Sequence, residues 1–160
     1  MKDKNLWMMC GIPGAGKSTW ISNNKNFFSG SINVVSRDKI RFALLDEGED
    51  YFSRENDVWS NFISEAKNSL KNYDNTILDA THLSVNSRKK VFNALKNNLK
   101  DVNICAIAFC CNIETAIERN ANRTGRSFVP VSAIRRMANQ FTIPTEEEGF
   151  DTILKVKIGA

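Results

Sequence analysis

Histidine, zinc-binding cysteine patterns and long hydrophobic runs are all scarce in this chain of 160 residues. It has a single histidine, and its four cysteines, at positions 10, 105, 110 and 111, do not show the spacing of zinc ligands. We therefore expect reduced, buried thiols and no zinc site. No apolar run approaches the length of a membrane span, and the N-terminus lacks the apolar region of a signal peptide, so we expect a cytoplasmic protein with no membrane contact.

The sequence also lacks internal repeats, low-complexity tracts and a linker rich in proline or glycine. A chain of this length without a linker is expected to form one domain spanning residues 1–160. The net charge of +4 is a mild excess, which suits a polyanionic substrate without requiring one. Basic residues concentrate in the last third of the chain, at Arg119, Arg123, Arg126, Arg135 and Arg136.

What the sequence does contain is the P-loop spacing Gly-x-x-x-x-Gly-Lys-Ser/Thr, in the segment Gly11-Ile12-Pro13-Gly14-Ala15-Gly16-Lys17-Ser18-Thr19. Glycines let backbone N–H groups curl around phosphate oxygens, and the helix that follows adds the positive end of its dipole. Lys17 is expected to reach the β- and γ-phosphates, and the Ser18 hydroxyl is expected to bind Mg²⁺.

The context favours this interpretation over a glycine-rich turn that binds nothing. A strand-like apolar run, residues 6–10, precedes the motif, and a helical segment, residues 18–22, follows it. ATP binding is therefore assigned to Gly11, Pro13, Gly14, Ala15, Gly16, Lys17, Ser18 and Thr19.

Short apolar runs alternate with helical patterns along the chain. The runs are Leu6–Cys10, Ile32–Val35, Thr76–Leu78, Ile104–Phe109 and Thr152–Val156, as expected for a sheet buried on both faces. This alternation predicts an α/β fold of three layers, with a central, mostly parallel sheet of about five strands between two layers of helices. Right-handed crossovers bring the C-terminal ends of the strands to one edge, so residues that directly follow strands become candidate site residues.

Asp38 and Arg41 follow the second predicted strand. A carboxylate at Asp38 would face the γ-phosphate, where it can accept a proton from an attacking hydroxyl. Arg41 shares a helix face with Asp38 and suits an acceptor that carries its own phosphate or carboxylate. The alternative is that Asp38 only caps a helix over Lys39–Leu45, and position alone does not separate the two.

Asp79 and His82 follow the third predicted strand. Asp79 stands where an acid commonly holds Mg²⁺ through water, and the alternative is an Asx turn. His82 either touches a substrate phosphate or hydrogen-bonds its own loop, and we favour the loop. Arg88 opens the next helix and faces either solvent or substrate.

Arg119, Arg123 and Arg126 would share one face of a continuing helix, which Thr124-Gly125 interrupts. A lid over residues 119–130 would close on a triphosphate, exclude water and bring positive charge to the transition state. The alternative is a solvated basic helix face.

Together these elements resemble the kinase domain of the polynucleotide 5′-kinases, over nearly the whole chain. Residues 11–20 are similar to that family's P-loop, and residues 37–41 are similar to its Arg-Asp-x-x-Arg motif. The resemblance implies that Asp38 is the general base and that Arg41 contacts the phosphate of the acceptor. Residues 79–82 look like its Asp-Ala-Thr-Asn element, with His82 where Asn is common.

The resemblance also covers the lid, through the similar element Glu118-Arg119-Asn120-x-x-Arg123 and the following Val129-Pro130. It implies Arg119 and Arg123 as triphosphate ligands, and a nucleobase of ATP bordered by residues 141–151. The candidate residues are then Lys17, Asp38 and Arg123 for catalysis; Ser18 and Asp79 for Mg²⁺; and Arg41, Asp79, Thr81, His82 and Arg88 for substrate.

Three functions remain open. The leading hypothesis is an ATP-dependent polynucleotide 5′-hydroxyl kinase acting on accessible ends of DNA or RNA. A kinase for a small-molecule hydroxyl, on a sugar, nucleoside or antibiotic, is the second, and a nucleotide-switched binding module or ATPase is the third. The acidic segment Asp46–Asp57, which includes Tyr51 and Phe52, would line the acceptor pocket and leaves the acceptor open.

Overall fold

The computed structural model describes residues 2–125 and 128–158. The strands are β1 (Lys4–Cys10), β2 (Ile32–Ser36), β3 (Asn75–Asp79), β4 (Val102–Cys111) and β5 (Thr152–Ile158). The helices are α1 (Lys17–Asn23), α2 (Arg37–Leu44), α3 (Glu55–Asn72), α4 (Val85–Leu95), α5 (Ile113–Ala121) and α6 (Val131–Gln140). Short 3₁₀ helices are η1 (Lys25–Phe27), η2 (Lys96–Asn98) and η4 (Glu146–Glu148).

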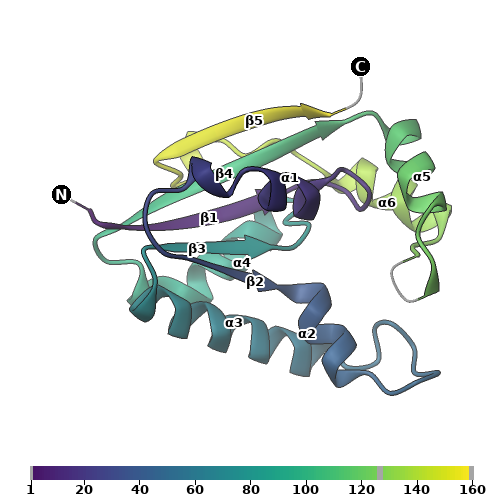
Figure 1. Ribbon diagram of the computed structural model, residues 1–160, viewed down its shortest axis with the longest axis horizontal. Helices are drawn as coiled ribbons and strands as arrows, with labels where there is room; N and C mark the ends of the chain where they lie inside the picture. The colour runs from purple at the N-terminus through teal and green to yellow at the C-terminus, as the bar shows by residue number, and fades with distance from the viewer. Residues whose placement is uncertain (1, 126–127, 159–160) are drawn as a thin grey trace.

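The strands form one sheet in the order β2-β3-β1-β4-β5 (Figure 1). Every neighbouring pair is parallel, so the sheet is parallel throughout rather than mostly so. The predicted strands are all present, and each is longer than its apolar run because polar residues at the ends also join the hydrogen-bonded ladder. The predicted α/β fold is thus confirmed.

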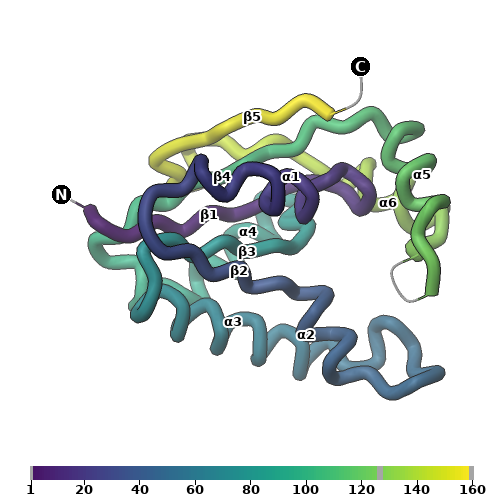
Figure 2. The backbone as a smooth tube through the Cα atoms, in the orientation of Figure 1, coloured from purple at the N-terminus to yellow at the C-terminus, as the bar shows by residue number. Residues whose placement is uncertain are grey.

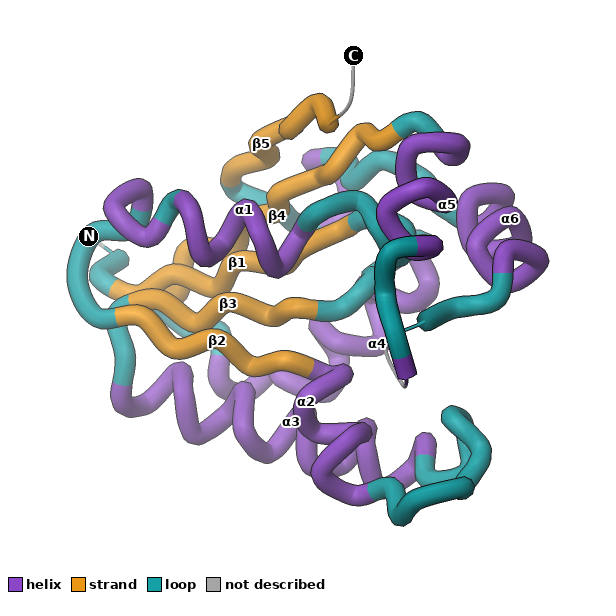
Figure 3. Tube along the Cα trace, turned by 45° about the vertical axis from the view of Figure 1, so that its right-hand side comes forward, coloured by secondary structure: helices purple, strands orange, loops and turns teal. Residues whose placement is uncertain are grey.

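Helices lie on both faces of the sheet (Figure 3), and a hydrophobic core lies between the sheet and the helices on each face. One core joins the sheet to α2, α3 and α4, and the other joins it to α1, α5 and α6. Consecutive residues of β1 alternate between them: Met8 belongs to the first core and Met9 to the second, and both are fully buried. This alternation is the period of a strand, and it makes β1 apolar along its length.

Helix α2 begins two residues earlier than the sequence pattern predicts. Its N-cap is Ser36, whose hydroxyl oxygen accepts a hydrogen bond from the backbone N–H of Lys39 at 3.2 Å. Asp38 lies in the first turn of the helix and is not the cap. The capping alternative for Asp38 is therefore wrong, because a better-placed serine already satisfies the helix end.

Helix α5 ends at Ala121, and Arg123 lies beyond it. The helix thus stops three residues before Thr124-Gly125, where the sequence predicts its interruption, so Arg119 and Arg123 do not share a helix face; Arg126 lies outside the described residues. The connection between α2 and α3 extends past the carboxyl edge of the sheet, on the opposite side from α5 (Figure 2).

All four cysteines are free thiols. Cys10 and Cys105 are buried as expected, but Cys110 and Cys111, at the end of β4, are only partly buried. The expectation of buried thiols was therefore wrong for this pair, although Cys111 still packs against the core beneath α5 and α6. Within residues 2–125 and 128–158, none of the helices is both long and apolar enough to pass through a membrane.

Candidate active site

The carboxyl ends of β2, β3 and β1 lie side by side and open into a cleft of about 750 Å³. The P-loop forms one wall with residues from the lid, and the first turn of α2 with the α2–α3 connection forms the other. Seven of the predicted site residues line this cleft on the P-loop and strand-end side: Pro13, Gly14, Gly16, Lys17, Ser18, Thr19 and Asp79. Asp38, Arg41, Thr81 and Arg123 also line it.

The P-loop backbone depends on glycine at two positions. Gly14 and Gly16 have φ of 82° and 88°, in the left-handed region that side chains disfavour. A Cβ at Gly14 would collide with the carbonyl oxygen of Ala116, so the loop lies directly against α5. A Cβ at Gly16 would lie 2.7 Å from Nη1 of Arg119, which brings this predicted ligand beside the P-loop although it does not line the cleft.

Two other P-loop residues act through the backbone alone. Ala15 is fully buried in the core, and Gly11 is buried at the end of β1. The N–H of Gly11 donates to the carbonyl of Thr81 at 2.9 Å, which fastens the P-loop to the loop after β3.

The ammonium of Lys17 folds back on its own loop, donating to the carbonyls of Gly11 at 2.7 Å and Ile12 at 2.9 Å. Burial lowers the pKa of Lys17 to about 8, and the carboxylates of Asp79 and Asp38 act in the opposite direction. The lysine therefore remains charged at neutral pH, and it interacts electrostatically with an aspartate on each side of the cleft.

Ser18 and Asp79 meet at the base of the cleft. The Ser18 hydroxyl donates to Oδ2 of Asp79 at 2.7 Å. Asp79 ends β3, and its register partner on β2 is Ser36, so the carboxylate lies between the P-loop and the helix that carries Asp38. A hydroxyl and a carboxylate in contact are oxygen donors of the kind Mg²⁺ prefers, and they leave the rest of its shell to water and phosphate. These two residues therefore fit a magnesium ion.

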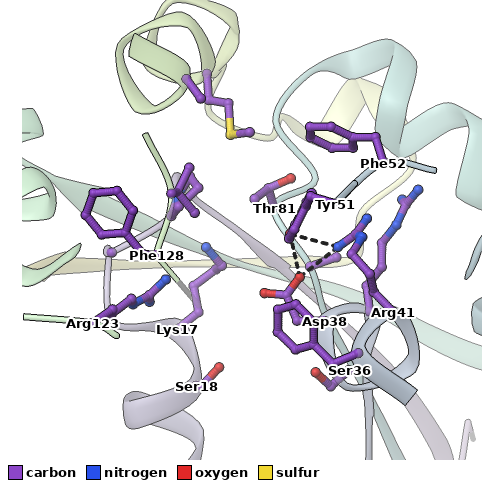
Figure 4. A pocket seen from close by; sticks show the side chains of 18 of the residues that line it. Lys17, Ser18, Ser36, Asp38, Arg41, Tyr51, Phe52, Thr81, Arg123 and Phe128 are labelled. Carbon is purple, nitrogen blue, oxygen red and sulfur yellow. Dashed lines mark hydrogen bonds and ion pairs between the residues drawn. The ribbon is translucent and has the colours of Figure 1, made fainter. Parts of the chain in front are cut away.

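Asp38 faces the P-loop from the opposite wall (Figure 4). Its side chain is 60% exposed, and Oδ1 accepts hydrogen bonds from Nη1 of Arg41 and from the Tyr51 hydroxyl, both at 2.8 Å. Both of these bonds use Oδ1, so Oδ2 is the carboxylate oxygen left for a proton.

Arg41 is less available than the sequence suggests, because it is only 4% exposed. Its Nε and Nη2 donate to Oε1 of Glu55 at 2.9 and 2.6 Å, and its guanidinium lies 4.2 Å from the centre of the Tyr51 ring. Asp38 and Glu55 both pair with Arg41, and Arg37 shares Glu55 at 3.1 Å, so two arginines are matched by two carboxylates. Arg41 lines the cleft, and its first role in this structure is to hold Asp38 and Glu55.

The lid is fastened at both ends. Asn120, fully buried on α5, accepts from the N–H of Val129 at 2.9 Å and donates to the Val129 carbonyl at 2.5 Å. This pair of bonds joins the last turn of α5 to the start of α6 across the lid. Arg123 lies between these ends and lines the cleft, and Figure 4 shows it on the same side as Lys17.

His82 lies below the cleft and does not line it. Its Nδ1–H donates to the carbonyl of Met9 at 2.6 Å, and its φ of 43° is in the left-handed region. Burial lowers the pKa of His82 to about 4, and the charges of Arg37, Lys17 and Arg88 lower it further. The ring is therefore neutral. It hydrogen-bonds strand β1 and not its own loop as we favoured, and its assignment to substrate binding is corrected because the buried ring does not line the cleft.

The stability of the protein is expected to fall as the pH drops from 6.5 to 4 because of this residue. The unfolded chain takes up a proton at His82 near pH 6.5, and the folded chain only near 4, so in between the unfolded state binds more protons. The free energy of unfolding is expected to be about 3 kcal/mol lower at pH 4 than at pH 7 because of His82. Urea unfolding of His82→Asn, whose side chain tolerates positive φ and does not titrate, should depend less steeply on pH between 7 and 5. Equal slopes for the two proteins would contradict the buried neutral ring.

Arg88 faces neither solvent nor the cleft. It is fully buried, donates to Glu148 from Nε at 2.7 Å and from Nη2 at 3.2 Å, and donates to the carbonyl of Thr142 at 2.9 Å. Its substrate-binding assignment is corrected, because these contacts hold α4 against the segment after α6. The acid that pairs with it stands 60 residues away, so no local pattern reveals the pair.

The segment Asp46–Asp57, expected to line the acceptor pocket, does contribute Tyr51, Phe52 and Glu55 to the cleft. No signal in the sequence indicated that Tyr51 and Glu55 would contact Asp38 and Arg41. Sequence reasoning also missed Arg136 and the half-exposed Phe128, which line the lid side. Nothing in the sequence distinguished Arg136 from its neighbour Arg135, which pairs with Glu114 on the surface.

The fold and the site together define a class: a P-loop domain with the architecture of the P-loop kinases. Residues 6–144 match the AAA_33 family, described as an AAA domain, and the chain belongs to that family.

Solved structures share the fold at low sequence identity. A chain of the Pnkp1/Rnl/Hen1 RNA repair complex is 24% identical with a TM-score of 0.73, over 88% of this chain and 44% of that chain. A putative kinase from Chloroflexus aurantiacus is 14% identical with a TM-score of 0.69, over 98% and 86%. A gluconokinase from Sinorhizobium meliloti is 14% identical with a TM-score of 0.58, over 100% and 86%. The protein thus spans less than half the length of the repair-complex chain, and the likeness is one of fold.

Proposed function

We propose that the protein is an ATP-dependent kinase that transfers the γ-phosphate to the 5′-hydroxyl of a polynucleotide. The observation that carries the proposal is the pair of facing walls, with Lys17 and Ser18 on one and the exposed carboxylate of Asp38 on the other. Phosphoryl transfer to an alcohol needs a cradle for the triphosphate and a base for the attacking hydroxyl, and a P-loop facing an exposed carboxylate supports this assignment.

The donor binds along the P-loop wall. The amides of residues 14–19 and the start of α1 hold the phosphates, and Lys17 leaves its backbone partners to contact the β/γ oxygens. Arg119, beside Gly16, and Arg123 stabilise the charge that develops on the leaving group. A magnesium ion held through Ser18 and Asp79 neutralises charge on the β- and γ-phosphates when it is bound.

The acceptor binds along the Asp38 wall. Its hydroxyl oxygen attacks the γ-phosphorus while Oδ2 of Asp38 takes the proton, and the bond between the γ-phosphorus and the β–γ bridging oxygen breaks to release ADP. Oδ1 of Asp38 stays bonded to Arg41 and Tyr51. The lid, held between α5 and α6 by Asn120, keeps water from competing as the nucleophile.

A polynucleotide acceptor is supported by the basic side of the cleft and by the similarity in fold to a chain of an RNA repair complex. Arg123 and Arg136 line the lid side of the cleft and can contact backbone phosphates next to the reacting end, and Arg37 lines it from α2, where it pairs with Glu55 at 3.1 Å. Binding through phosphates is salt-dependent, so the KM for an oligonucleotide should rise steeply with salt.

A small-molecule alcohol is the second candidate, and the Arg41 contacts favour it. The charges of Arg41 and Arg37 are already matched by those of Asp38 and Glu55, and the segment Asp46–Asp57 that borders the acceptor wall is strongly acidic. A phosphate-bearing acceptor would have to approach this negative surface, whereas a neutral alcohol would not.

Labelled phosphate transfer from ATP separates the two candidates. We expect transfer to 5′-hydroxyl DNA or RNA oligonucleotides, and none to the same oligonucleotides with a 5′-phosphate, because the reacting oxygen is blocked. A panel of sugars, nucleosides and aminoglycosides, assayed at the same concentration, serves as the comparison. A larger kcat/KM for a member of that panel than for the 5′-hydroxyl oligonucleotide would contradict the polynucleotide proposal and favour a small-molecule kinase. Phosphate release from ATP without any acceptor would indicate an ATPase.

A further inference from the structure

Tyr51 makes close contacts in the cleft that the mechanism above does not require. It lies in the connection between α2 and α3, and its hydroxyl accepts from Nη1 of Arg41 and donates to Oδ1 of Asp38, each at 2.8 Å. Its ring lies against the Arg41 guanidinium, with centroid to Cζ at 4.2 Å, and edge-on to Phe52, with centroids 4.7 Å apart. Figure 4 shows the three polar groups converging at one point of the cleft wall.

The direction of these hydrogen bonds follows from the chemistry of the groups. A guanidinium only donates and a carboxylate only accepts, so the phenol must accept from Arg41 and give its own proton to Asp38. Burial raises the pKa of Tyr51, and the negative charge of Asp38 raises it further. The hydroxyl therefore keeps its proton, and with it the bond to Asp38, throughout the working pH range.

The contacts of Oδ1 come from two different elements. Arg41 reaches it from α2, three residues along the same helix, and Tyr51 reaches it from the α2–α3 connection. A carboxylate turns about its last torsion with little preference, so one neighbour on the same helix leaves its plane free to rotate. A second donor from another direction fixes that plane.

We propose that Tyr51 is a positioning residue for Asp38, holding Oδ1 so that Oδ2 faces the hydroxyl that is phosphorylated. The proposal rests on the proposed function, in which Asp38 takes the proton. Tyr51 itself touches neither the donor nor the reacting atoms. Its action is confined to the orientation of the base, and so to the chemical step.

The variant Tyr51→Phe tests this, because it keeps the ring against Arg41 and removes only the hydroxyl. We expect kcat to fall by about tenfold or more, the size of a lost hydrogen bond to a charged group, with the KM for ATP unchanged. The matched control is Tyr73→Phe, at the only other tyrosine in the chain, which lies at the far end of α3 and should keep the wild-type rate.

A double variant shows whether the effect runs through Asp38. In an Asp38→Asn background, Tyr51→Phe should change the residual rate by less than twofold, since there is no base left to orient. A Tyr51→Phe enzyme within twofold of the wild type, beside an inactive Asp38→Asn enzyme, overturns this proposal alone. A Tyr51→Phe protein that binds nucleotide more weakly, or melts at a lower temperature than the wild type, also overturns the proposal. In that case the substitution disturbs more of the protein than the orientation of Asp38. An active Asp38→Asn enzyme overturns the base assignment first, and this proposal with it.

Discussion

Replacing Asp38 by asparagine is expected to lower the rate of phosphoryl transfer by about a hundredfold or more, because general base catalysis contributes an effect of that size. Asparagine has nearly the same shape, and its carbonyl can still accept from Arg41 and Tyr51 at the place of Oδ1. It cannot take up a proton at the second position. The loss should therefore appear in kcat, measured as labelled phosphate transferred to an acceptor, with the dissociation constant for ATP nearly unchanged.

A second aspartate on the same side of the molecule provides the control. Asp50 lies in the α2–α3 connection and is exposed, so Asp50→Asn removes the same charge without touching the Asp38–Arg41–Tyr51 contacts. That variant should keep the wild-type rate within about twofold, since an exposed charge is largely screened. Equal losses in both variants would mean that the charge of the acceptor wall, and not a base at Asp38, supports the reaction.

Replacing Arg88 by methionine is expected to destabilise the fold by about 3–5 kcal/mol, since it leaves a buried carboxylate unpaired. Arg88 is fully buried and the Glu148 side chain is 8% exposed, and they pair at 2.7 Å. Burial alone would raise the pKa of Glu148, but the hydrogen bonds from Arg88 and Thr145 lower it. Urea unfolding at neutral pH measures the loss as a shift of the midpoint at constant slope.

The surface pair Arg135–Glu114 provides the comparison for this prediction. Its side chains are 53% and 64% exposed, at a distance of 3.1 Å, so Arg135→Met should cost less than about 1 kcal/mol. The double variant Arg88→Met with Glu148→Leu should recover much of the loss, because it removes the unpaired charge as well. Similar, small losses for Arg88→Met and Arg135→Met would contradict the structural role assigned to the buried pair.

The donor half of the site was predictable because its signals are local. Residues 11–19 form a continuous motif whose glycines, lysine and serine act within one loop, and Asp79 directly follows a strand that the apolar pattern reveals. A parallel sheet then brings the ends of adjacent strands together, so the contact between Ser18 and Asp79 follows from the topology. The roles of these residues in ATP and Mg²⁺ binding stay predictions.

The acceptor half was not predictable in the same way. Arg41 was expected to meet a substrate phosphate, and instead it bonds Asp38, Tyr51 and Glu55. Asp38 is a neighbour on the same helix, but Glu55 comes from the start of α3 and Tyr51 from an irregular connection, whose path no periodic pattern describes. Arg88 shows the same limit, because its carboxylate partner lies beyond α6 and the sequence contains many acids that could pair with it.

By itself the sequence determined the order of strands and helices, the P-loop, and the edge of the sheet where the site residues gather. Those features depend on short patterns of apolar, glycine and charged residues, which act over a few neighbouring positions. Only the tertiary structure decided which arginine is buried with an acid, which way Asp38 is held, and that Tyr51 holds it. Those outcomes depend on distances between segments far apart in the chain, where burial decides which charge is paired and which stays open to a ligand.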